Sequence, residues 1–96
     1  MPADSNPMTI EEWRAQFDRI DQAILALLGE RQSIARGLGK WKRERGIPVL
    51  NTKRERALID HLAESRPEGL SREVIERIWN AILTASKEAQ TITTGD

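Results

Sequence analysis

The sequence contains no cysteine, a single histidine and few aromatic residues, and each shortage excludes a class of function. Without cysteine there is no disulfide framework and no thiolate chemistry. One histidine, His61, argues against a histidine-based metal site or a Ser-His triad within one chain. Aromatic residues make up only 4% of the chain, which argues against stacking platforms for single-stranded nucleic acid. We therefore expect a function that uses neither a thiol nor a metal.

The chain also lacks an excess of charge and a long apolar run. Fifteen basic residues balance fifteen acidic ones, so nothing draws the whole chain to nucleic acid or to an anionic membrane. Without an apolar run or a signal-peptide core, we expect a soluble, cytoplasmic protein. Its 96 residues correspond to one small domain. We expect a disordered leader at residues 1–8, a helical domain at 9–91 and a frayed tail at 92–96.

What the sequence does have is a long amphipathic stretch from Thr9 to about Arg45. Thr9 and Glu12 form a capping box at its start, and Gly46 ends it. Its apolar residues recur every three or four positions, as in helices that pack against helices: Ile10, Trp13, Phe17, Ile20, Ile24, Leu27, Ile34, Leu38 and Trp41. Such a helix is about 54 Å long, whereas a compact domain of this size has a radius of gyration near ~12 Å. Another chain must cover part of this apolar seam, so we predict an obligate oligomer, most simply a two-fold dimer.

Two shorter amphipathic helices are predicted at 52–65 and at 71–91, with Ser71 as the N-cap of the second. Their expected inner faces are Ala57, Leu58 and Leu62 in the first, and Val74, Ile75, Ile78, Trp79, Ile82 and Leu83 in the second. No segment shows the alternation of a strand, so the predicted class is all-α with three helices. Gly37 and Gly39 weaken the long helix by about 1 kcal/mol each relative to alanine. Their presence indicates close approach of another backbone or of a ligand.

Polar side chains interrupt these apolar faces. Arg31 stands in the seam of the long helix. Lys42 follows eleven residues later, about 20° round the helix and ~16 Å along its axis, so the two can grip one small dianion. Arg54 lies on the inner side of the second helix, and Ser86 and Gln90 continue the inner stripe of the third. Buried charges and amides need partners, so these positions require an explanation.

Each of these residues also has an ordinary explanation when it is taken singly. Arg31 can be solvated or can pair with a buried carboxylate, and Lys42 is typical of a charged last turn. Arg54 belongs to a charged helix start, Ser86 can bond its own backbone, and Gln90 lies near the chain end. Taken together, we interpret them as the lining of a buried pocket for a carboxylated ligand.

Arg14 adds a point of geometry. It precedes Arg31 by seventeen residues, about 25 Å along a helix, so the two cannot hold one small ligand from the same chain. In an antiparallel dimer, however, Arg14 of one chain can approach Arg31 of the other.

Three stretches carry a resemblance to a known family: WRAQFDRIDQAILALLGERQSIARGLGKWK, PVLNTKRE and ASKEAQ. Over about residues 9–91 the chain resembles the small all-helical chorismate mutases, the AroQ class. The family's spaced set of polar residues is matched here by Arg14, Arg31, Lys42, Arg54, Glu55, Ser86 and Gln90. One position departs from the pattern, because Asn51 stands where the family commonly has an aspartate that binds a ring hydroxyl.

The resemblance implies an intertwined homodimer of three-helix chains in which each of two sites borrows Arg14 from the partner. It implies a one-step rearrangement of chorismate to prephenate that needs no cofactor and no metal. It also implies three groups of residues: Arg14, Arg31, Arg54 and Ser86 at the two carboxylates, Lys42 and Gln90 at the ether oxygen, and Asn51 and Glu55 at the ring hydroxyl. Lys42, Gln90 and Arg31 are then the catalytic groups.

Three other functions stay open. An isochorismate-pyruvate lyase would use the same cations on the same fold, and a 4-amino-4-deoxychorismate mutase would take a related substrate. Asn51 disfavours the amino substrate, because an ammonium group favours an acidic partner. The third is a non-catalytic helical dimerisation module, indifferent to these dianions. A helix-turn-helix DNA-binding protein is disfavoured because no predicted helix has a basic face.

Overall fold

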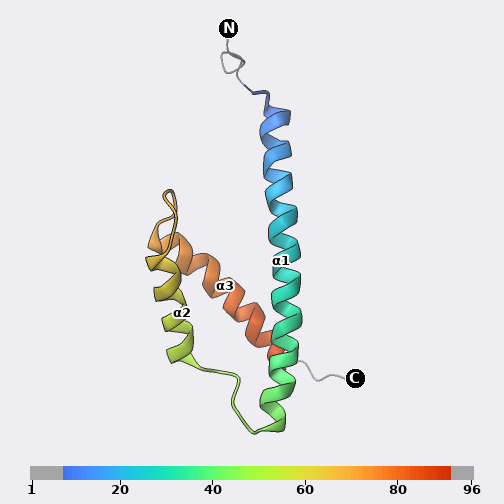
Figure 1. The fold of residues 1–96 in the computed structure, drawn as a ribbon, viewed down its shortest axis with the longest axis vertical. Coiled ribbons are helices and arrows are strands. Elements are labelled where there is room, and N and C mark those ends of the chain that lie inside the picture. Colours follow the sequence, from blue (N-terminus) through green and yellow to red (C-terminus); the bar gives the residue numbers. More distant parts are fainter. Residues whose placement is uncertain (1–7, 92–96) are drawn as a thin grey trace. The chain divides into compact units, whose positions relative to one another are not determined.

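The computed structural model describes residues 8–91, and within this range the chain forms three α-helices and no strand (Figure 1). The helices are α1 (Ile10–Glu44), α2 (Thr52–Glu64) and α3 (Arg72–Thr91). The all-α class is confirmed, and every boundary lies within one residue of the predicted one. Except for Met8, the expected leader and tail lie outside the described residues.

Residues 8–30 form one unit, which contains the N-terminal part of α1. The predicted capping box is confirmed: Thr9 Oγ1 accepts from the Glu12 amide at 3.2 Å, and Glu12 Oε1 accepts from the Thr9 amide at 3.0 Å. The hydrogen bonds from the backbone and hydroxyl of Thr9 lower the pKa of Glu12. Seven large apolar side chains of this unit are 44–66% exposed in the single chain: Ile10, Trp13, Phe17, Ile20, Ile24, Leu25 and Leu27.

Residues 31–91 form the second unit, which begins with the C-terminal part of α1. This helix ends as predicted, at a glycine with positive φ: Gly46 has φ +65°. The Ile47 amide donates to the Lys42 carbonyl at 2.9 Å, and the Gly46 amide donates to the Arg43 carbonyl at 3.3 Å. These two bonds define a Schellman motif, which turns the chain sharply into the loop before α2.

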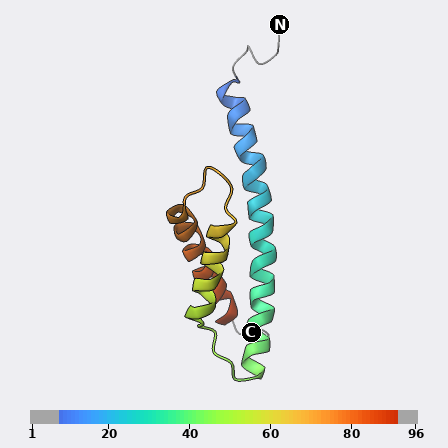
Figure 2. The ribbon, with the colours of Figure 1, turned by 60° about the vertical axis from the view of Figure 1, so that its left-hand side comes forward.

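Within the second unit α2 and α3 pack against each other (Figure 2). Each begins with a side-chain cap. Asn51 Oδ1 accepts from the Arg54 amide at 3.0 Å, and Ser71 Oγ accepts from the Val74 amide at 3.2 Å. Arg72 of α3 pairs with Asp60 of α2 and with Glu76, and these bonds raise the pKa of the guanidinium. The predicted N-cap at Ser71 is therefore confirmed, and the cap at Asn51 is a new feature.

The predicted inner faces are correct only in part. In α3, Ile75 and Leu83 are buried, but Ile78 is 44% exposed; in α2, Ala57 is exposed and Ala63 is buried instead. In the C-terminal part of α1, the seam residues Ile34, Leu38 and Trp41 are exposed, and the buried residues are Ala35 and Gly39. At Gly39 the reason is close packing, because the backbone of α3 at Gln90 lies directly against this residue.

Candidate active site

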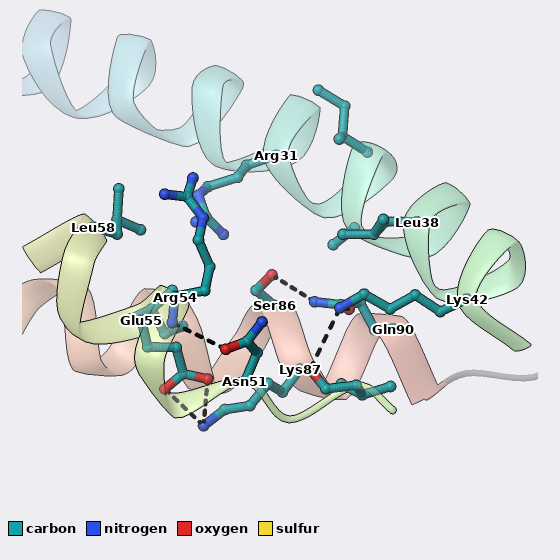
Figure 3. Close-up of a pocket in the computed structure, with 14 residues that line it drawn as sticks. Arg31, Leu38, Lys42, Asn51, Arg54, Glu55, Leu58, Ser86, Lys87 and Gln90 are labelled. Carbon is teal, nitrogen blue, oxygen red and sulfur yellow. Dashed lines mark hydrogen bonds and ion pairs between the residues drawn. The ribbon is translucent and has the colours of Figure 1, made fainter. Parts of the chain in front are cut away.

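One pocket of about 350 Å³ lies within residues 31–91, between the C-terminal part of α1, the start of α2 and the last turns of α3 (Figure 3). Its volume is in the range of small-molecule sites, roughly 300–1,000 Å³. Seven of the eight residues predicted for the site line it: Arg31, Lys42, Asn51, Arg54, Glu55, Ser86 and Gln90. The eighth, Arg14, is exposed and belongs to the other unit.

Arg31 and Arg54 direct their guanidinium groups into the same part of the pocket from α1 and α2 (Figure 3). Among residues 8–91, neither forms an ion pair with a carboxylate. Two neighbouring cations without an acidic partner repel each other, and an anion between them removes that repulsion. Of the two alternatives for Arg31, full exposure does not apply because the residue is half-buried on the pocket wall, and among residues 8–91 no carboxylate pairs with it.

Gln90 is held on α3 by contacts from α1. A Cβ atom on Gly39 would lie 2.6 Å from the Gln90 Cα, so only glycine allows the two backbones to come this close. Arg43 Nη1 donates to the Gln90 carbonyl at 2.7 Å. The predicted close approach is confirmed at Gly39, whereas none of residues 8–91 lies within 4 Å of a Cβ atom on Gly37.

The side chains of Lys42, Gln90 and Ser86 form a hydrogen-bonded row along the pocket (Figure 3). Lys42 Nζ donates to Gln90 Oε1 at 2.9 Å and to the Val49 carbonyl at 3.4 Å. Gln90 Nε2 donates to Ser86 Oγ at 3.4 Å, and both of these side chains are buried. Because both acceptors of Lys42 are neutral, the ammonium is positioned without being neutralised.

Lys87 also lines the pocket, and sequence reasoning missed it. Its ammonium pairs with the carboxylate of Glu55, with Nζ 3.3 Å from Oε2 and 3.4 Å from Oε1. A lysine beside a glutamate and a serine is typical of a solvated helix surface. The available signal was its spacing: Lys87 lies four residues after Leu83 and three before Gln90, on the same side of α3.

The electrostatics of the pocket suit an anion. Four cationic side chains line it, from Arg31, Lys42, Arg54 and Lys87, against the single carboxylate of Glu55. Among the described residues, no cluster of His, Cys, Asp or Glu could hold a metal ion. No helix within 8–91 is long and apolar enough to cross a membrane.

A known protein family matches most of the chain. Residues 13–91 match the family described as chorismate mutase type II. The chain belongs to this family. The resemblance drawn from the sequence motifs is therefore confirmed, over nearly the whole range expected from them.

Two curated relatives carry chorismate mutase in their names. The chain is 30% identical over 80 residues to a bifunctional chorismate mutase/prephenate dehydratase of Aquifex aeolicus, an alignment that covers 79% of this chain and 22% of the relative. It is 36% identical over 53 residues to a chorismate mutase of Methanocaldococcus jannaschii, covering 55% of this chain and 54% of the relative. The chain thus spans about a fifth of the first relative's length and about half of the second's.

A solved structure of similar size agrees with these relatives. Chorismate mutase (form II) from Thermus thermophilus is 30% identical, with a TM-score of 0.82. The match covers 84% of this chain and 92% of that chain, so the two share most of their helical fold.

Proposed function

We propose that the protein is an isomerase that rearranges chorismate to prephenate. The observation that carries this proposal is the pocket of a chorismate mutase family member, in which cations and neutral donors from three helices surround a space of small-molecule size. In the rearrangement a C–O bond breaks while a C–C bond forms within one molecule. The residues therefore have two tasks: to hold the flexible side chain of the substrate over its ring, and to stabilise developing charge.

Arg31 and Arg54 bind the two carboxylates of the substrate in this proposal, with Ser86 in support. A guanidinium group presents two parallel N–H donors, which match a carboxylate. The convergence of the two guanidinium groups in Figure 3 supports this role. Asn51 and Glu55, on the opposite wall, contact the ring hydroxyl.

Lys42 and Gln90 stabilise the negative charge that grows on the ether oxygen. The 2.9 Å between Lys42 Nζ and the Gln90 amide supports this assignment, because one ligand atom can lie within reach of both groups. Lys42 Nζ is held at the pocket by two neutral acceptors, and a donor held in place before the reaction needs little reorganisation during it, which is the main source of electrostatic catalysis.

We further propose that the active form is a homodimer in which Arg14 comes from the partner. The exposed apolar seam of residues 10–27 supports this, because monomeric proteins seldom leave so continuous an apolar stripe in water. Arg14 lies on the same stretch of helix as this seam, so covering the seam with a second chain brings Arg14 to that chain.

The test is conversion of chorismate to prephenate, followed by ultraviolet absorbance, in the parent protein and in Lys42→Ala. Removing one preorganised donor typically lowers turnover about 10²–10³-fold, and we expect a loss of this size in kcat/KM. Lys40→Ala is the matched control, because Lys40 is exposed on the same helix and does not line the pocket. A Lys42→Ala protein within a few-fold of the parent would contradict the assignment.

Assays with the related substrates and a melting experiment separate the alternative functions. Release of pyruvate from isochorismate without prephenate from chorismate would identify a lyase. Turnover of 4-amino-4-deoxychorismate alone would identify the amino-substrate mutase. A folded dimer whose melting temperature does not respond to a bicyclic transition-state mimic would identify a dimerisation module, because a ligand that binds the folded state raises that temperature.

A further inference from the structure

The wall of the pocket opposite the two arginines is built by Asn51, Glu55 and Lys87 (Figure 3). Lys87 comes from α3 and Glu55 from α2, and their charged groups are 3.3 Å apart. The two side chains are 34% and 24% exposed. The pair is therefore partly shielded from water, and its charges act on a neighbouring ligand more strongly than those of a fully exposed pair.

Asn51 adds no negative charge to this wall. Its Oδ1 is engaged with the Arg54 amide as the N-cap of α2. The Nδ2 group forms no hydrogen bond with the described residues and is a donor. This wall therefore offers a ligand a neutral N–H donor from Asn51 and a carboxylate whose charge Lys87 already balances.

We propose that Lys87 is a positioning residue that sets substrate specificity: by neutralising Glu55, it makes this wall accept a ring hydroxyl and reject a ring ammonium. The inference rests on the proposed function, because it concerns the substituent of that same substrate. A hydroxyl accepts from Asn51 Nδ2 and donates to Glu55, since a carboxylate has enough lone pairs to serve both Lys87 and the hydroxyl. An ammonium finds no uncompensated negative charge there, and the ammonium of Lys87 repels it.

The competing explanation is that the pair only ties α2 to α3. That role predicts a lower stability when Lys87 is replaced, with no change in the relative binding of the two substituents. The two explanations therefore differ in the ratio of the affinities for chorismate and 4-amino-4-deoxychorismate. A loss of stability alone does not change this ratio.

The experiment compares Lys87→Met, Lys87→Arg and the parent. KM and kcat are measured for chorismate, and the inhibition constant of 4-amino-4-deoxychorismate is measured against chorismate turnover. We expect Lys87→Met to shift the preference toward the amino compound by at least about tenfold, the effect of one partly screened charge that contacts the same carboxylate as the ring substituent. Lys87→Arg restores the pair and keeps the parental preference within about threefold.

Two further variants complete the design. Lys53→Met removes the same charge from an exposed position outside the pocket, and it leaves the preference unchanged. Asn51→Asp keeps a residue that caps helices well and adds a negative charge to the wall, so it shifts the preference in the same direction as Lys87→Met. If Lys87→Met does not fold, judged by circular dichroism, Asn51→Asp provides the test: an unchanged preference in that variant contradicts the proposal.

The possible failures are distinguishable. An unchanged preference in a folded Lys87→Met protein, or an equal shift in Lys53→Met, would overturn the role of Lys87 while leaving the proposed mutase activity intact. A parent protein that does not convert chorismate would instead overturn the proposed function.

Discussion

Gly39 has no side chain to contribute, yet it sets how closely α1 approaches the backbone of α3 at Gln90. Alanine at this position would bring a Cβ atom to 2.6 Å from Gln90 Cα, and the obstacle is backbone, which cannot rotate away. We expect Gly39→Ala to lower the free energy of unfolding by about 1–3 kcal/mol, as overpacking does. It should also reduce turnover of chorismate, because α3 must move and takes Gln90 with it. Urea denaturation and the chorismate assay measure the two effects.

Gly37 provides the matched control two residues away on the same helix. A Cβ atom at Gly37 meets nothing within 4 Å in the described part of the chain, and alanine favours a helix over glycine by up to about 1 kcal/mol. Gly37→Ala should therefore leave the stability unchanged or raise it. Equal losses at both positions would show that the contact with Gln90 is not what requires glycine at 39.

At this same scale, the sequence predicted seven residues of the pocket lining but not Lys87. Arg31, Ser86 and Gln90 are visible because they are polar where the helical period expects apolar residues. Lys87 has a charged partner on another helix, and a sequence pattern does not show which surface lysine will meet which carboxylate. The capping bond of Asn51 is of the same kind, because it depends on the local backbone angles at the start of α2.

At the scale of elements, helix ends proved more predictable than helix faces. Ends depend on local signals, such as the box of Thr9 and Glu12 and the positive φ of Gly46. Which face of a helix is buried depends on the helix or chain that packs against its apolar stripe. Along α1 the periodic pattern marks Ile34 and Trp41 as inner residues, yet within this chain both are exposed. Periodicity identifies an apolar stripe, but it does not say whether the same chain covers that stripe.

The cap of α1 gives a pH-dependent prediction. The pKa of Glu12 is lowered in the folded protein because its carboxylate accepts hydrogen bonds from Thr9. The stabilisation is therefore present above the ordinary pKa of glutamate, about 4.3, and is lost as the pH falls through the lower folded value. We expect the protection of the first-turn amides of α1, taken relative to free amide exchange at the same pH, to fall over this acidic window, as measured by NMR.

Replacing Glu12 by glutamine should remove that dependence, because an amide does not titrate there. Glu11→Gln is the control, since Glu11 does not share the capping bonds and the loss of protection should persist. Persistence of the full pH effect in Glu12→Gln would contradict the cap as its source.

At the scale of the whole molecule, the proposed sharing of Arg14 can be tested by mixing two inactive proteins. Arg14→Ala and Lys42→Ala should each have little activity in the chorismate assay. If each site takes Arg14 from the partner, a hybrid dimer of the two variants contains one site with both residues intact. Random exchange of subunits should then restore about a quarter of the parental activity, because half of the dimers are hybrids and half of their sites are complete.

The control for this mixture is a pair of variants at the same pocket, Lys42→Ala with Gln90→Ala. Both residues come from one chain, so no hybrid contains a complete site and activity should stay low. No recovery in the mixture of Arg14→Ala and Lys42→Ala, with subunit exchange verified by mass spectrometry, would show that Arg14 does not act across the interface.

The hydrogen bond from Lys42 Nζ to Gln90 Oε1 affects how fast a substrate can bind productively. For Lys42 and Gln90 both to donate to one ether oxygen, the Gln90 amide group has to rotate. Its Nε2 then leaves Ser86 Oγ and takes the place of Gln90 Oε1. The same rotation frees the serine hydroxyl for a carboxylate. Productive docking is then coupled to a half-turn about one side-chain torsion, and the NH₂ resonances of this single glutamine report each arrival and departure.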